Sequence, residues 1–499
     1  MQIKFPRLSL NRREVFVIGL GLVVGLLIAT LATQWMFFDD AYIHMRIARN
    51  FLEHGQPYFN LGDHFKADSS TGYVLLLSMA LAWFSPGVAI RVVEGGAIVF
   101  TSIALTLLVY KNAGSRVMSV ITVLAMLPAF LLAASGGMET AIACCLLSWA
   151  IVFWCEQKYQ YMVALISVAA GFRIELVLLL LLVIVYVVRS ENQRLRIILW
   201  ASPFAIICLL DVLWFGSIFP HAAKAKSIGY GFPLQKSIQN AAGILRWKFL
   251  ALVLVFASLA SVFHLLKSRL RPSLSDALLI YAGFLFAAWA LSRSILFEWY
   301  LCLLSFPIGL LLLASKQRNA LMQRVACYVV IFGSCIYAWG LLVYFGPANR
   351  EGHVNMRVPY YIKVASGLSE VCPTCTLATT EIGGIGYGFK GPVFDAFGLA
   401  DPEAIRYHPL KVPEERADYG IGAIPPAYVE FRRPDFVVTL DVYSQALQSS
   451  EVVKSYNKYD CPFPPDLLIY SKKSGVKVFS RKYIPLDVLE KTGCHSVKS

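Results

Sequence analysis

Short polar motifs interrupt an otherwise apolar sequence at separated points along the chain. The first motif holds two adjacent aspartates, Asp39 and Asp40, and later ones hold glutamates, arginines, lysines and a histidine. A carboxylate can accept a proton from a hydroxyl group, and cations can stabilise negative charge that develops on a phosphate. Because polar side chains are costly within a membrane, they are candidates for function. The candidate site residues are Asp39, Asp40, Arg46, Asn50, Glu139, Arg173, Glu175, His221, Lys224, Lys226 and Arg293.

The two aspartates begin a segment with the spacing of an amphipathic helix. At about 100° per residue, Asp39 shares one face with Arg46 and Asn50, and the opposite face is apolar, as a helix at a membrane surface requires. Asp39 and Asp40 point about 100° apart, so only one of them can face a given substrate. We expect the catalytic base in this pair, with Asp39 favoured over Asp40. The alternative is that one aspartate only caps the helix.

The remaining candidates divide into cations and supporting residues. The residues that could bind a donor phosphate or another part of the substrate are Arg46, Arg173, His221, Lys224, Lys226 and Arg293. For each cation, a position at the membrane rim with the charged end reaching water is the alternative interpretation. Asn50, Glu139 and Glu175 are expected to support the site, and both glutamates can pair with arginines. No metal ligands are expected, and a requirement for a divalent metal stays open.

The overall composition indicates a membrane protein. The chain has 499 residues, of which 57% are hydrophobic and only 15% are charged, whereas soluble domains have roughly 25% charged residues. The net charge of +14 does not indicate nucleic-acid binding, because the basic residues lie mostly in short loops between apolar blocks. Such loops are typical of the cytoplasmic side of a membrane protein. Membrane lipids are the expected surroundings, and a nucleic-acid partner is not expected.

Apolar blocks long enough to cross a bilayer predict a polytopic α-helical protein. About eleven membrane helices are expected at about 20 residues per crossing; they lie near residues 15–36, 88–110, 117–134, 140–155, 161–172, 174–188, 197–215, 249–266, 276–291, 300–315 and 325–345. Residues 71–84 are apolar but too short to cross, so we expect them to lie in the membrane interface. With this assignment, the loops rich in lysine and arginine all fall on the cytoplasmic side.

The same assignment predicts two domains in a bacterial inner membrane. Residues 1–345 form the expected catalytic membrane domain, with the N-terminus in the cytoplasm. The polar motifs gather on the outer side, which indicates one shared site there. Residues 346–499 are expected in the periplasm, where glycine, proline, charge and short β-like runs at 436–440 and 476–480 predict one small α/β domain.

Four cysteines lie in the predicted outer domain, at Cys372, Cys375, Cys461 and Cys494. Their Cys-Pro-Thr-Cys motif is compatible with a redox or zinc site, but a second such motif is missing. In an oxidising compartment, structural disulfides are the favoured interpretation. The sequence leaves their connectivity open.

Three short motifs resemble those of the bacterial GT-C glycosyltransferases, especially the group that contains mycobacterial arabinofuranosyltransferases. Asp39-Asp-Ala-Tyr-Ile43 resembles the first-loop pattern of this family, and Gly137-Met-Glu-Thr140 is similar to its second-loop motif. Arg173 and Glu175 match an Arg-Pro-Glu-Gly motif, although Ile174 and Leu176 replace its proline and glycine.

The resemblance continues through the rest of the chain in matching order. The segment from Phe219-Pro220 to Lys226 is similar to a Leu-Pro-Asn-Thr motif that ends in Ala-Lys, with His221 in place of asparagine. In the predicted outer domain, residues 381–387, Asp395 and residues 398–399 resemble the outer domain of the family.

The resemblance implies inverting transfer of a sugar from a polyprenyl-phosphate donor, with a first-loop aspartate as base. The lipid-linked sugar would be the donor, and the acceptor would be a glycan, lipid or protein of the cell envelope. No other cofactor is implied. Such transfer needs a proton acceptor, cations for the leaving phosphate and an apolar groove for the lipid chain.

Two other functions compete with glycosyl transfer. A transporter or flippase of lipid-linked glycans would be expected to have inverted repeats and broken helices near the middle of the membrane; the sequence has no evident repeat, and its polar motifs lie toward one side. A sensory or assembly protein with a membrane anchor would explain the outer domain, but it would leave the aspartate pair and Arg173 unexplained.

Overall fold

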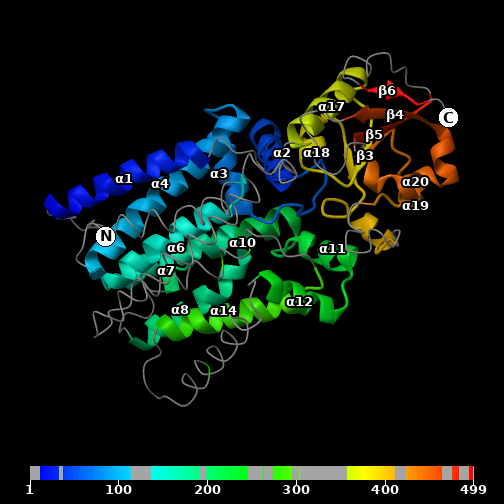
Figure 1. The fold of residues 1–499 in the computed structure, drawn as a ribbon. Helices are drawn as coiled ribbons and strands as arrows, with labels where there is room; N and C mark the ends of the chain where they lie inside the picture. Colours follow the sequence, from blue (N-terminus) through cyan, green and yellow to red (C-terminus); the bar gives the residue numbers. More distant parts are fainter. Residues whose placement is uncertain are drawn as a thin grey trace.

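The computed structural model describes residues 12–32, 38–113, 136–190, 198–244, 274–294, 357–410, 423–462, 475–482 and 494–497, together with residues 262, 300 and 303. The described chain has two parts. Long helices lie side by side in the first part, and a β-sheet with flanking helices lies at one end of them (Figure 1).

Runs of leucine, isoleucine, valine and alanine form the helices of the first part. These helices are α1 (Arg12–Ala32), α4 (Pro86–Ala113), α6 (Thr140–Cys155), α7 (Tyr159–Phe172), α8 (Val177–Ser190), α10 (Ser202–Phe215) and α14 (Leu274–Leu291). Within the described residues, Pro86–Lys111 is long and apolar enough to cross a membrane, and six apolar helices are shorter. The count of about eleven spans stays a prediction. The expected spans at 117–134, 249–266, 300–315 and 325–345 lie outside the described residues, apart from isolated positions.

Large apolar side chains are exposed on the outer faces of these helices. Examples are Val23 on α1, Phe100 on α4, Leu181 on α8 and Leu213 on α10, each more than half exposed. Apolar surface spread over several helices is characteristic of a protein that contacts lipid or a partner.

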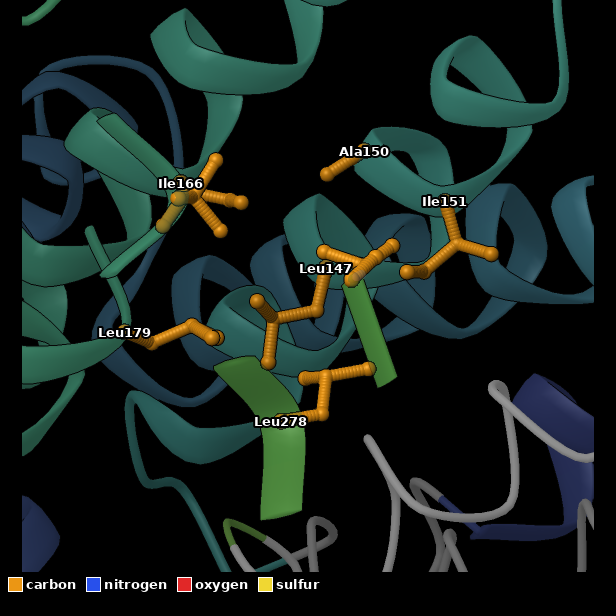
Figure 2. Close-up of a pocket in the computed structure, with 8 residues that line it drawn as sticks. Leu147, Ala150, Ile151, Ile166, Leu179 and Leu278 are labelled. Atoms are coloured by element: carbon orange, nitrogen blue, oxygen red, sulfur yellow. The ribbon is translucent and has the colours of Figure 1, made fainter. Parts of the chain in front are cut away.

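The interior of the helical part is closely packed. A small apolar cavity lies between α6, α7, α8 and α14, where Leu147, Ile166, Leu179 and Leu278 point toward one another (Figure 2). It has room for about one water-sized sphere. This cavity is therefore too small for a lipid chain, and none of its lining residues is polar.

Shorter helices lie at the end of the helical part that meets the sheet. These are α2 (Asp39–His54), α3 (Thr71–Leu81), α11 (His221–Tyr230) and α12 (Leu234–Ile244). The helix expected from Asp39 is confirmed, and it ends where Gly55 adopts a φ of 69°, a left-handed conformation that favours glycine. The apolar face of α2 does not face lipid as expected: Ala41, Met45 and Ala48 are fully buried, and α2 packs against α3.

The second part contains a six-stranded mixed sheet. Its strands are β1 (Leu377–Thr379), β2 (Val393–Asp395), β3 (Phe436–Leu440), β4 (Tyr456–Pro462), β5 (Gly475–Arg481) and β6 (His495–Ser496), in the order β2-β1-β3-β5-β4-β6. The strands β2, β1 and β3 are parallel, and the remaining pairings are antiparallel. The two runs predicted as strands are confirmed as β3 and β5, which pair with Val438 opposite Val478.

Helices accompany this sheet, in keeping with its parallel strands. They are α17 (Arg357–Val371), α18 (Gly384–Gly388), α19 (Pro426–Arg432) and α20 (Gln445–Gln448). The loops that follow β1 and β2 reach the first part of the chain: Gly383 contacts Asp39 on α2, and Phe397 contacts Gly229 and Tyr230 on α11. The carboxyl ends of these parallel strands therefore face α2 and α11.

The four cysteines of the second part form two disulfides. Cys372 pairs with Cys375 directly after α17, and Cys461 on β4 pairs with Cys494 beside β6. This agrees with the expected disulfides and supplies the connectivity that the sequence left open. The second bridge joins two strands at the edge of the sheet, so it holds the end of the chain to that edge.

Candidate active site

A carboxylate and an ammonium group meet where α2 faces α11. Asp40 is the second residue of α2, and its Oδ2 atom lies 3.8 Å from Nζ of Lys226 on α11. Their side chains are 31% and 15% exposed, so the aspartate remains accessible. Lys226 also lies within electrostatic range of Arg173, Tyr230 and Tyr300. The structure thus gathers a proton acceptor and two cations from separate segments.

Arg173 is a buried cation beside this pair. It follows α7 and precedes the short 3-10 helix Ile174–Leu176, and its Nη1 lies 3.0 Å from Oε1 of Glu139 and 3.9 Å from Oε1 of Glu175. Its guanidinium carbon lies 5.0 Å from the centre of the Tyr300 ring. Within the described chain, its Nε and Nη2 atoms are buried and have no hydrogen-bond partner. Buried donors normally have partners, so these two can serve a bound anion.

Glu139 holds Arg173 in place and belongs to a wider buried cluster. Its Oε1 accepts a hydrogen bond of 3.1 Å from Ser69 Oγ, and its Oε2 lies 3.6 Å from Nε2 of His44. Burial alone would raise the pKa of Glu139, but Arg173 and His44 outweigh burial and hold that pKa below its ordinary value. Sequence reasoning missed His44, although it lies four residues after Asp40, on the same face of α2.

Asp39 turns away from this cluster toward the second part of the chain. Its carboxylate accepts hydrogen bonds from the backbone N–H groups of Gly383 at 3.0 Å and Gly384 at 2.8 Å. A Cβ atom at Gly383 would lie 1.9 Å from the Asp39 carbonyl oxygen, so only glycine fits there. Burial, together with the nearby carboxylate of Glu381, raises the pKa of Asp39 to about 7. The carboxylate that pairs with Lys226 belongs to Asp40, so the geometry favours Asp40 where the sequence favoured Asp39, and the choice of base stays a prediction. Neither aspartate occupies the N-cap position of α2, which Phe38 takes.

Arg46 differs from the expectation of phosphate binding, because all of its N–H groups are engaged within the protein. The buried guanidinium donates to the carbonyl oxygens of Phe59, Gly386, Phe389 and Gly391 and to the side chain of Asn60. Asn50 donates to the carbonyl oxygens of Tyr58 and Phe59, which agrees with a supporting role. Arg46 therefore attaches the loop after β1 to α2 and does not offer a free donor to a ligand.

The other predicted cations are spread around the cluster. His221 begins α11, its ring lies 4.6 Å from that of Phe65, and burial together with Lys224 lowers its pKa. Lys224 is exposed, and a spacing of two residues puts it about 200° from Lys226 around α11. Arg293 is also exposed and has a φ of 52°; its backbone bonds to Phe232 and Ser237. The structure brings neither Lys224 nor Arg293 into contact with Asp40.

An ion pair from the second part of the chain completes the surroundings of Asp39. Nη2 of Arg357 lies 3.2 Å from Oε2 of Glu381, and both residues lie within electrostatic range of Asp39. Arg357 was not predicted, because nothing in its local sequence distinguishes it from a surface arginine. Among the described residues, no group of three or more histidine, cysteine or acidic side chains could hold a metal ion.

Comparison of the chain with protein-family models, with curated proteins and with solved structures finds no match. A partly exposed carboxylate lies beside a lysine, and a buried arginine nearby has two donors that find no partner among the described residues. This arrangement can accept a proton and stabilise an anion within one small region.

Proposed function

We propose that the chain is a membrane glycosyltransferase of the GT-C type. It would transfer a sugar from a polyprenyl-phosphate donor to a glycan, lipid or protein of the cell envelope, at the outer face of the bacterial inner membrane. The observation that carries the proposal is the Asp40–Lys226 pair beside Arg173, whose two buried donors lack a partner within the described chain. The resemblance of the loop motifs to that family supports the same function.

In the proposed reaction, Asp40 accepts the proton of the attacking hydroxyl group. The hydroxyl oxygen forms a bond to the anomeric carbon while the bond from that carbon to the phosphate oxygen breaks. The electron pair leaves with the lipid phosphate, and Lys226 and Arg173 stabilise its negative charge. Attack from the side opposite the phosphate inverts the anomeric configuration. Asp39 takes no proton in this scheme and instead keeps the loop after β1 against α2.

A membrane location supports a lipid-linked donor. Apolar side chains cover the outer faces of α1, α4, α8 and α10, and the polar cluster lies at the end of these helices that meets the sheet. A lipid phosphate at the membrane surface could reach that end while its chain stays among apolar side chains. We propose that the second part of the chain lies in the periplasm, since its disulfides suit an oxidising compartment.

Binding of undecaprenyl phosphate to the purified protein in nanodiscs tests the phosphate site. Lys226→Ala and Arg173→Ala should each weaken the affinity about tenfold or more, because hydrogen bonds between charged groups are lost. Lys224→Ala is the matched control, since it removes an equal charge from the exposed side of the same helix. Equal affinities for the Lys224 and Lys226 variants would remove Lys226 from the site.

A second experiment separates transfer from transport. Mass analysis of cell-envelope glycans should reveal a missing sugar in cells that lack the protein and in cells that carry Asp40→Asn. A transporter or flippase of lipid-linked glycans would use the same cations but would need no base. Normal glycans in the Asp40→Asn cells, together with retained lipid-phosphate binding, would therefore favour transport.

A further inference from the structure

One buried carboxylate takes no part in the proposed reaction. Glu94 lies on α4, about 9 Å along the helix from the expected outer end of that span. Its side chain is fully buried, and its Oε1 atom accepts a hydrogen bond of 2.6 Å from the backbone N–H of Gly137. A carboxylate inside a membrane helix is costly, so one that is present is expected to serve a function.

The turn that Glu94 holds supports the start of α2. Gly137 has a φ of 80°, a conformation that favours glycine, and its carbonyl oxygen accepts a hydrogen bond of 2.8 Å from Tyr73. The neighbouring Gly136 accepts a hydrogen bond of 2.7 Å from the backbone N–H of Phe38. A Cβ atom on Gly136 would lie 1.7 Å from the Phe38 ring, so this close approach requires glycine. Phe38 directly precedes the two aspartates.

The same turn supports the cationic side of the site. It continues into Glu139, whose carboxylate lies 3.0 Å from Arg173. A displacement of residues 136–138 would therefore move the start of α2 and the partner of Arg173 together.

We propose that Glu94 is a positioning residue that sets the distance between the base Asp40 and the phosphate-binding Arg173 by fixing residues 136–138. This inference rests on the proposed function for its significance, while the contacts that carry it do not depend on that function. Glu94 itself touches no substrate and transfers no proton.

Two substitutions distinguish the role of the Glu94 acceptor oxygen from the role of its charge. Glu94→Gln keeps an oxygen that can accept the hydrogen bond from Gly137, whereas Glu94→Leu fills similar space without an acceptor. We expect Glu94→Leu to weaken undecaprenyl phosphate binding in nanodiscs about tenfold, and Glu94→Gln to bind nearly as well as the unaltered protein. Ser102→Ala on α4 is the control, because among the described residues its hydroxyl donates to the carbonyl of Ile98 in the same helix and makes no bond to the turn.

A double variant that combines Glu94→Leu with Arg173→Ala tests whether Glu94 affects lipid-phosphate binding through Arg173. If Glu94 acts through Arg173, the double variant should bind no more weakly than Arg173→Ala alone. Losses of affinity that add up in the double variant would overturn the positioning role. It would also be overturned if Glu94→Leu kept its affinity while Arg173→Ala lost affinity. A Glu94→Gln variant as weak as Glu94→Leu would also overturn it, since charge and not the acceptor oxygen would then matter.

Amide hydrogen exchange can test the contacts of Glu94 even if the proposed function is wrong. If the unaltered protein binds no undecaprenyl phosphate, the proposed function fails, and the contacts of Glu94 can still be tested. Glu94→Leu should then accelerate amide exchange in residues 38–45 and 136–142 but leave β3 unchanged. Unchanged exchange in both segments, or faster exchange throughout the chain, would overturn the inference.

Discussion

The ammonium group of Lys226 lies 3.8 Å from the carboxylate of Asp40, and this ion pair joins α2 to α11. The neighbouring Asp39 bonds instead to the backbone of Gly383 and Gly384, more than 340 residues away. Adjacent residues on a helix point about 100° apart, so one pair of aspartates reaches two different surroundings. This division explains why two acidic residues occur together: one faces the cations and the other attaches the second part of the chain.

The first prediction concerns the base. Asp40→Asn should lower the transfer rate by roughly 10²–10⁴-fold and preserve lipid-phosphate binding, because an amide cannot accept the proton. Asp39→Asn should retain much more activity, since its amide oxygen can still accept from one backbone N–H. The transfer rates and melting temperatures of both variants show which aspartate is the base. If Asp39→Asn lost transfer while Asp40→Asn kept it, Asp39 would be the base.

The second prediction concerns the pH dependence of stability. Folding raises the pKa of Asp39 from 3.8 to about 7, so between these pH values the folded protein holds a proton that the unfolded chain has lost. The resulting stabilisation is full below about pH 4 and is lost as the pH rises through about 7. The melting temperature of the unaltered protein relative to Asp39→Asn should therefore fall between pH 5 and pH 8.

The matched control for this titration is Glu53→Gln, which removes an exposed carboxylate from the same helix. Its melting temperature relative to the unaltered protein should show no comparable trend. A constant difference between the unaltered protein and Asp39→Asn from pH 5 to pH 8 would mean that Asp39 does not titrate near neutrality.

The third prediction concerns Arg46. A lysine cannot reach the acceptors that the Arg46 guanidinium bonds in several directions, so Arg46→Lys should leave buried carbonyl oxygens without partners. We expect a loss of about 3 kcal/mol or more in the free energy of unfolding. Thermal melts, with limited proteolysis of the second part of the chain, would measure it. Arg49→Lys is the control, since in the described chain Arg49 donates a long hydrogen bond to the carbonyl of Tyr387 and lies over the ring of that residue; equal losses would contradict the assignment.

The fourth prediction concerns orientation in the membrane. The lysine- and arginine-rich loops predict a cytoplasmic N-terminus and an outer C-terminus. A reporter that is active only outside the cytoplasm should be active when fused after Ser499 and inactive after Arg194 or Ser268. Activity after Arg194, or inactivity after Ser499, would be incompatible with the proposed site facing the periplasm.

The sequence could predict elements whose causes are local. The helix from Asp39 follows from side-chain spacing and ends at Gly55, and β3 and β5 follow from β-branched and aromatic runs. The pairing of Glu139 with Arg173 was among the expected possibilities, because both were placed on the outer side. In each of these cases, the type of residue and its position along the chain are enough to predict the element or the pair.

Contacts with backbone atoms could not be predicted in the same way. Asp39 bonds to two N–H groups and Arg46 bonds mainly to carbonyl oxygens. Every residue except proline has both groups, so no side-chain pattern marks these partners. Glu94 did leave a signal, since it is a lone carboxylate within an apolar block. Its partner is the backbone N–H of Gly137, 43 residues away, which no side-chain pattern marks.

The last prediction concerns the two disulfides. In the loop-entropy account, a bridge stabilises more when it closes a longer loop. Cys461 and Cys494 are separated by 33 residues and Cys372 and Cys375 by three, which corresponds to about 4 and about 2 kcal/mol respectively. Cys461→Ser with Cys494→Ser should therefore lower the melting temperature more than Cys372→Ser with Cys375→Ser. Thiol labelling of the denatured, non-reduced protein should miss all four cysteines and reach Cys144, Cys145, Cys155 and Cys208, which belong to no disulfide in the described chain. Labelling of Cys461 or Cys494 without a reductant would refute the bridge, and an equal loss of stability in the two double variants would show that loop length does not govern the effect here.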